Sequence, residues 1–194
     1  MLRAQGNLPA ALESFRAALA IREQLAKADP GNTESQRNLC VSRNKIGDVL
    51  AAQGDPQGAL ENFRASLAIA ERMAKADPGS AEWQRDLANA NVMIGAVHLR
   101  QKEEAKAMDA FQRALDIYGE MIRRNPDDEQ ARLFSAVPLW GIGTLMGNRG
   151  GKELEEALAI LKPRAETDKL DANKLESIPE IEKQIASLKK GWRK

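Results

Sequence analysis

The chain has 194 residues, of which 43% are hydrophobic, 29% charged and only 4% aromatic, and its formal net charge is +1. This composition is that of a soluble, folded protein, and the abundance of Ala, Leu, Glu, Lys and Arg favours closely packed helices. The near-neutral charge gives no electrostatic reason to expect a nucleic acid or a membrane as partner. The single cysteine, Cys40, fits a reducing compartment, and no apolar run is long enough to span a bilayer, so we expect a cytoplasmic protein.

Apolar residues recur at three- and four-residue steps along most of the chain, which is the period of an amphipathic helix. The first predicted helix ends before Pro30, because the residue that precedes a proline disfavours helical torsions. Asn32 and Ser80 are expected to cap the helices that follow them. In chain order, the expected helices span residues 7–29, 34–52, 56–76, 81–101, 103–124, 128–147, 152–166 and 172–190.

Two positions depart from this regular pattern. Lys102 stands where the preceding copy has the turn glycine Gly54, so the turn before residue 103 is less strongly indicated. Pro138 falls in the middle of the helix expected over 128–147. A proline there removes a backbone hydrogen bond and clashes with the preceding turn, so we expect a kink or a restart of the helix.

The sequence repeats itself with a period of 48 residues. Residues 5–30 and 53–78 are identical at 17 of 26 positions, and self-similarity at such a period indicates a stacked array of helix pairs. We divide the chain into an array over 1–149 and a degenerate last helix with a C-terminal cap over 150–194. Within the array we expect a partial copy over 1–31, two full copies over 32–79 and 80–126, and a degraded copy from 127 to 149 and onward.

The recurring residues resemble the tetratricopeptide repeat family. In one copy they are Ile46-Gly47, Leu50, Gly54, Ala59, Phe63 and Pro78, and in the next Ile94-Gly95, His98, Ala107, Phe111 and Pro126. Each unit is about 14 residues longer than the ordinary 34-residue repeat, so the chain is similar to the extended bacterial arrays and to kinesin light chains. The resemblance implies an all-α fold, a right-handed α-solenoid of antiparallel helix pairs with a C-terminal capping helix.

Three glycines recur in the middle of predicted helices, at Gly47, Gly95 and Gly143. Glycine inside a helix costs about 0.5–1 kcal/mol relative to alanine. Close approach of a neighbouring helix would compensate for that cost. We therefore expect Phe63 and Phe111 to fill the space between helices next to these glycines.

The resemblance also implies a function, which is the binding of a peptide or another protein in the concave face that the first helix of each pair lines. No cofactor, metal or catalytic residue is implied. The exposed face of those helices offers amide, charged and apolar side chains, and Trp140 is of the type that dominates binding hot spots. The candidate binding residues are Arg37, Asn44, Asp48, Arg85, Asn89, Val92, Leu99, Trp140 and Thr144.

The residues that often carry catalysis are few and occur in packing positions. His98, the only histidine, occupies a packing position of the repeat, and Cys40 is expected to be a small buried hydrophobe. Neither has the neighbours in sequence that a metal site needs. Trp83 and Trp192 are expected to fix contacts between helices or at the terminus. We therefore predict a non-enzymatic interaction scaffold.

A second hypothesis concerns assembly. Residues 2–6 match the end of the first helix of a repeat, and the bulk of that helix is missing from the sequence. The predicted helix 7–29 therefore lacks the helix with which it would pair. Its apolar side, formed by Leu8, Leu12, Phe15 and Leu19, is then expected to be covered by an upstream domain, by a second copy or by nothing. Residues 7–29 are on this hypothesis a homo-oligomer interface, or the chain is the C-terminal part of a larger array.

Overall fold

The computed structural model describes residues 8–165 and 172–191, and all the regular elements in these ranges are helices. In chain order they are α1 (Leu8–Ala28), α2 (Thr33–Gln53), α3 (Pro56–Ala76), α4 (Ala81–Arg100), α5 (Glu104–Arg124), α6 (Glu129–Met146), the 3-10 helix η2 (Gly147–Arg149), α7 (Gly151–Ala165) and α8 (Ala172–Gly191). Each of the eight expected α-helices is present, with ends a few residues from those expected.

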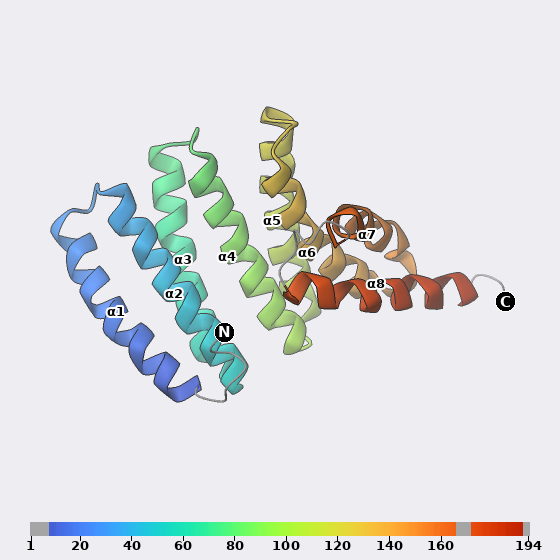
Figure 1. Ribbon diagram of the computed structural model, residues 1–194, viewed down its shortest axis with the longest axis horizontal. Helices are drawn as coiled ribbons and strands as arrows, with labels where there is room; N and C mark the ends of the chain where they lie inside the picture. The colour runs from blue at the N-terminus through green and yellow to red at the C-terminus, as the bar shows by residue number, and fades with distance from the viewer. Residues whose placement is uncertain (1–7, 166–171, 192–194) are drawn as a thin grey trace.

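The helices form a row in which each α-helix packs against the next one in the chain (Figure 1). The first helices of successive pairs, α2, α4 and α6, also contact one another, whereas α3 and α5 touch at most marginally. In a curved stack, the helices on the inner side lie closer together than those on the outer side. The first helices therefore line the inner face of the array, as the repeat pattern predicts.

Helices begin where a short polar side chain accepts a hydrogen bond from the first turn. Asn32 Oδ1 accepts from the backbone N–H of Ser35 at 2.9 Å, and Ser80 Oγ accepts from that of Trp83 at 3.3 Å. A cap of this kind contributes about 1 kcal/mol. Both predicted caps are thus confirmed.

The turn at Lys102 forms although it lacks a glycine. Lys102 has a φ of 60°, in the left-handed region where Gly54 has 80° in the preceding copy. The backbone N–H of Glu103 donates to the carbonyl of His98 at 2.9 Å, which closes the end of α4. The turn geometry of the repeat is therefore kept at some conformational cost to the lysine.

Glycines on the first helices lie against aromatic rings of the second helices. A Cβ atom placed on Gly47 would lie 2.5 Å from Phe63 Cε1, and one on Gly95 would lie 2.7 Å from Phe111 Cδ1. The ring of Phe111 is held from a second side, because a Cβ on Gly141 of α6 would lie 2.4 Å from its Cε2 atom. Both phenylalanines are at most 2% exposed. The predicted close approach at Gly47 and Gly95 is confirmed.

In the fourth pair a glycine of the first helix again lies in close contact with the next helix, but the residue that it meets is a leucine and not a phenylalanine. A Cβ on Gly143 would lie 2.8 Å from Leu154 Cγ of α7 and 3.0 Å from the carbonyl oxygen of Gly150. Pro138 is buried within α6, which continues through it without interruption. The restart that the sequence suggests does not occur, because the buried packing on both sides of Pro138 holds the helix together.

The apolar side of α1 is partly covered from within the chain. Leu12 is 9% exposed and belongs to a cluster that includes residues of α2 and α3. Leu8, Phe15 and Leu19 are partly buried against the same cluster. Helix α2 therefore covers part of this side within the chain, and the assembly hypothesis for residues 7–29 stays a prediction.

The candidate reactive side chains have structural positions, as predicted. Cys40 is 1% exposed, and its Sγ lies 3.6 Å from the carbonyl oxygen of Ser66. Burial raises the pKa of the Cys40 thiol to about 11. His98 is 3% exposed and pairs through Nδ1 with Glu103 at the start of α5. Trp192 lies outside the described residues.

Substitution of Gly95 by alanine tests the contact between glycine and ring. Phe111 has Gly141 on its other side and cannot retreat, so we expect the Gly95→Ala variant to lose about 1–3 kcal/mol of stability. Gly119 of α5 provides the control, because a Cβ there would meet only an Arg123 side-chain atom at 3.8 Å. Gly119→Ala should gain about 0.5–1 kcal/mol. Urea unfolding followed by circular dichroism measures both, and equal effects would contradict the close packing.

The buried thiol gives a second test. With its pKa raised from 9.0 to about 11, Cys40 has roughly 100-fold less thiolate near pH 8 than a free cysteine, and the thiolate is the reactive form. We expect iodoacetamide to modify the native protein at least ~100-fold more slowly than the protein in denaturant, as measured by mass spectrometry. Equal rates in the two states would show that Cys40 is accessible.

Candidate functional site

The two predicted binding arginines form ion pairs between successive first helices. Arg37 of α2 reaches α4, with Nη1 at 2.6 Å from Glu82 Oε2 and Nε at 3.3 Å from Asp86 Oδ2. Arg85 of α4 reaches α6, with Nη2 at 3.7 Å from Asp128 Oδ2. Both guanidinium groups therefore join neighbouring units and are only partly available to a ligand.

Asp86 is a residue that the sequence reasoning missed. Burial raises the pKa of its carboxyl group, while the nearby Arg37 guanidinium acts in the opposite direction. A partly buried carboxylate of this kind depends on its cationic neighbour. The available signal was that Asp86 lies about one repeat after Arg37 in the sequence. Whether the two side chains meet depends on how α2 and α4 cross, which the sequence does not state.

Three further candidates pack between helices. The hydroxyl group of Tyr118 on α5 donates to Asn89 Oδ1 at 2.6 Å, and burial raises the pKa of that hydroxyl group. Val92 is 8% exposed, and Leu99 packs partly buried against the same cluster of α4, α5 and α6. These residues therefore serve the contact between units.

The last two candidates lie beside α8 and form hydrogen bonds with it or with each other. The indole N–H of Trp140 on α6 donates to Gln184 Oε1 of α8 at 3.3 Å. The hydroxyl group of Thr144 donates to the carbonyl of Trp140 at 2.8 Å and lies 3.2 Å from Gln184 Oε1. Trp140 also packs against a buried cluster that includes Ile181 and Ile185 of α8. Helix α8 thus contacts the α6 end of the predicted binding face and partly buries Trp140 there.

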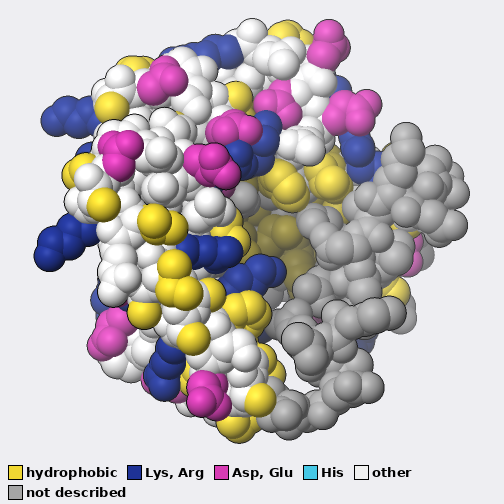
Figure 2. Space-filling view, turned by 60° about the vertical axis from the view of Figure 1, so that its left-hand side comes forward, with side chains coloured by type: hydrophobic (Ala, Val, Ile, Leu, Met, Phe, Trp, Pro, Cys, Tyr) yellow, Lys and Arg dark blue, Asp and Glu magenta, His cyan; other side chains and the backbone are white. Residues whose placement is uncertain are grey.

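On α2 the predicted face includes an exposed apolar side chain. Val41 is 43% exposed. Asn44, one turn further along, has a buried Oδ1 atom with no hydrogen-bond partner in the described part of the chain. Asp48 is half-buried and takes part in an interaction. Seen from nearer α1, the molecule is hollowed, with hydrophobic side chains in the hollow and basic side chains beside it (Figure 2).

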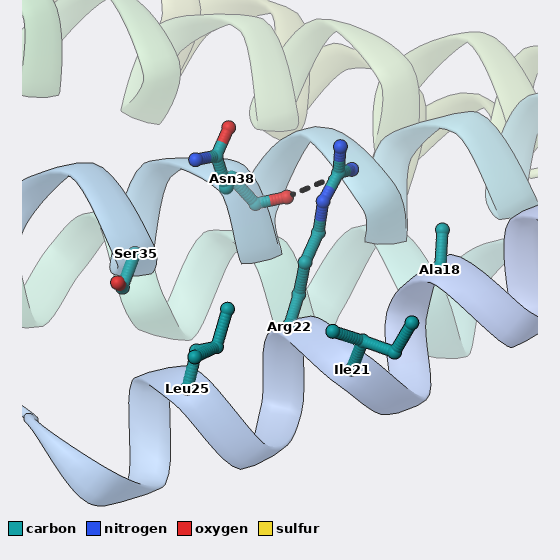
Figure 3. Close-up of a pocket in the computed structure, with 6 residues that line it drawn as sticks. All are labelled: Ala18, Ile21, Arg22, Leu25, Ser35 and Asn38. Carbon is teal, nitrogen blue, oxygen red and sulfur yellow. Dashed lines mark hydrogen bonds between the residues drawn. The ribbon is translucent and has the colours of Figure 1, made fainter.

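A pocket of about 240 Å³ lies elsewhere, in the seam between α1 and α2. Arg22 crosses this seam and donates to the carbonyl of Asn38 at 3.4 Å (Figure 3). It also donates to Ser42 Oγ. Ile21 and Leu25 of α1 are 61% and 56% exposed, the largest such values among the described hydrophobic side chains. The lining residues are Ala18, Ile21, Arg22, Leu25, Ser35 and Asn38. Sequence reasoning did not identify this pocket.

Other kinds of site find no support within residues 8–165 and 172–191. Groups of three or more His, Cys, Asp and Glu side chains that could bind a metal ion do not occur there. None of the helices in these ranges has the length and apolar character needed to cross a membrane.

Comparison with solved structures gives one match with a TM-score above 0.5 and weaker ones below it. The crystal structure of BtubC (BKLC) from P. vanneervenii superposes with a TM-score of 0.54 and 15% sequence identity, covering 96% of this chain and 84% of that one. A MamA structure gives a TM-score of 0.40 at 21% identity, over 93% of this chain and 80% of that one. The designed helical repeat protein DHR64 gives 0.35 at 14% identity, over 95% and 96%. Curated protein sequences give no significant match.

Two family models match the sequence directly. Both are described as tetratricopeptide repeats, and they match residues 38–120 and 1–30. Together the matches cover more than half of the chain's 194 residues, and they include the glycines and phenylalanines that lock α2 to α3 and α4 to α5. With the row of paired helices and the shared fold, they lead to one conclusion: the chain belongs to the tetratricopeptide repeat family.

Proposed function

We propose that this chain is a non-catalytic scaffold that binds a peptide or protein segment along the inner face of α2 and α4. The proposal rests on the family, whose helix pairs are a protein-interaction fold, and on the surface that the ion pairs and α8 leave open. Four of the candidate residues form a contact with a neighbouring helix, so their side chains are only partly available to a ligand. They are Arg37, Arg85, Asn89 and Trp140.

One observation carries the proposal. On a single face of α2, the exposed Val41 side chain stands one turn before Asn44, whose buried Oδ1 atom has no partner among the described residues. A buried acceptor without a partner costs about 1–3 kcal/mol. A rotation of the Asn44 side chain toward Val41 would bring this acceptor to the surface, where the backbone N–H of a bound peptide would satisfy it, and an apolar side chain of the peptide would cover Val41. The pair therefore marks the centre of the proposed site.

The test begins with peptides selected from a random library against the whole chain. For a peptide that binds this face, we expect Val41→Asp and Asn44→Ala each to raise Kd at least about tenfold, or 1.4 kcal/mol. The apolar contact or the hydrogen bond would be lost in each case. Titration calorimetry measures the affinities, and circular dichroism checks that helicity is kept.

Ile21→Asp is the matched control, because it places the same charge on another exposed apolar side chain outside this face. Arg85→Ala and Trp140→Ala are less informative, since each would also remove a contact between helices. If every selected peptide binds the Val41 and Asn44 variants as tightly as the original chain, this face is not the binding site.

A further inference from the structure

Helix α8 follows α6 in the register of the repeat. Glycine recurs every 48 residues, at Gly47, Gly95, Gly143 and Gly191. The first three lie in α2, α4 and α6, and Gly191 is the last residue of α8. By this register α8 is the first helix of a further unit, and its residues correspond one by one to those of α4 and α6. If α8 continued the stack, it would bury the same stripe of residues that α4 and α6 bury.

The structure buries a different stripe of α8. In α4 the side chains of Trp83 and Ala90 are buried, as are their equivalents in α6, and Trp83 packs against buried residues of α3. The residues of α8 at the same two positions of the repeat are Pro179 and Ala186, and both are exposed. Helix α8 therefore does not present to α7 the stripe that joins a first helix to the second helix before it.

Helix α8 buries instead the stripe that lines the inner face in the earlier units. Ile181 and Ile185 are 0% and 8% exposed, and Leu188 packs partly buried against the same cluster. Their equivalents include four of the candidate binding residues, which are Arg85, Asn89, Val92 and Trp140. Helix α8 is thus turned about its own axis, and it lies across the direction of α2 to α5 (Figure 1). Its inner-face stripe is apolar and rests on the array.

The surface that receives α8 belongs to α6 and α7. Leu139 of α6 and Leu154 and Leu161 of α7 are buried in one cluster with Ile181 and Ile185. The backbone of α8 lies close to that of α7 and approaches that of α6 at most marginally. Side chains therefore make the contact with α6, and most of the buried area between α8 and the array is apolar.

The polar contacts of α8 with the array are weak by comparison. Gln184 Oε1 accepts from the indole N–H of Trp140 at 3.3 Å and lies 3.2 Å from the hydroxyl oxygen of Thr144. Both distances are at or beyond the long end of the range for such bonds. The ion pair of Lys162 with Glu182, at 3.1 Å, is about half exposed, and exposed pairs contribute little. A few apolar side chains therefore hold α8 in place.

We propose that α8 is an autoinhibitory helix, which occupies the α6 end of the inner face until an amphipathic helix of a partner protein replaces it. The inference rests on the proposed function, because it takes the inner face as the binding surface. Helix α8 shows the chemistry of the incoming helix. Two isoleucines lie four residues apart, a leucine follows at the seventh residue, and a glutamine amide at the third accepts from Trp140. Release of α8 frees Trp140 and Thr144, so that the ligand extends from α2 to α6.

The test uses a fluorescent peptide of the α8 sequence, residues 172–191, and the whole chain. We expect this peptide to bind the Ile181→Asp variant at least about tenfold more tightly than the original chain. The substitution places a charge in the buried stripe and detaches α8, and a site that is no longer occupied from within has a lower apparent Kd. Fluorescence anisotropy gives the affinities, and equal binding by the two chains would overturn the proposal.

Ala186→Asp is the matched control, because it places the same charge on the exposed side of α8. We expect this variant to bind the peptide as weakly as the original chain does. Binding as tight as that of Ile181→Asp would show that the gain comes from added charge, and the proposed competition would be wrong.

Hydrogen exchange tests the release of α8 in the original chain, without any substitution. We expect the backbone amides of residues 180–188 to exchange at least about tenfold faster than those of α4, because α8 leaves the array while the array stays folded. Mass spectrometry of proteolytic fragments measures both. Equal protection of α8 and α4 would mean that α8 does not leave separately, and this would overturn the proposal.

Further substitutions in the Ile181→Asp chain locate the peptide. Trp140→Ala should weaken binding at least about tenfold, and in this background α8 is already detached, so the effect reports on the peptide. Val41→Asp, on α2, should leave the affinity unchanged. The opposite result would place the peptide on α2 and overturn the proposal. Because Val41 and Asn44 test the proposed function and Trp140 tests the α6 end, failure of one is distinguishable from failure of the other.

A second copy of this chain is the competing occupant, since its α8 has the same sequence as the peptide. Sedimentation velocity across a concentration range distinguishes the two cases. A monomeric original chain supports an α8 that rests on its own array. A dimer that Ile181→Asp converts to a monomer would show that α8 is exchanged between copies, and the proposed autoinhibition would be wrong.

Discussion

The stack depends on the absence of a side chain at a few positions of the first helices. A ring carbon of Phe111 stands where a methyl group on Gly95 or on Gly141 would have to be, so α4, α5 and α6 meet at one point. This contact sets how closely each second helix approaches its first helix. The ion pairs, the seams and the inner face all depend on that spacing. The glycines that weaken the isolated helices are thus what allows the helices to pack.

The repeat made this part of the fold predictable from the sequence. Helix positions follow from apolar periodicity, and the contact of Gly47 with Phe63 follows from their recurrence 48 residues later as Gly95 and Phe111. Local signals were sufficient because each unit contacts mainly its neighbours. The continuous α6 was not predictable in this way, because the packing around Pro138 involves α7 and α8, where the repeat has faded.

The interaction surface was less predictable, for a related reason. Whether Arg37 faces a ligand or Asp86 depends on the distance between α2 and α4, which no residue pattern states. Trp140 lies in the predicted stripe, but α8 lies beside it and Gln184 accepts from its indole N–H. The pocket between α1 and α2 is a space that side chains leave unfilled. The small residue Ser35 does not indicate such a space by itself, and it does so only by comparison with Trp83, which is buried at the equivalent position of the next repeat.

The ion pairs between first helices have a mechanical consequence. Arg37 with Asp86, and Arg85 with Asp128, tie the inner layer together near the N-terminal ends of α4 and α6, while the outer helices α3 and α5 touch at most marginally. A change in the curvature of the array would have to change the length of these ionic contacts, whereas close packing fixes the contacts between glycine and ring. Because the paired side chains are partly buried, dissolved salt screens them much less than it screens exposed ion pairs.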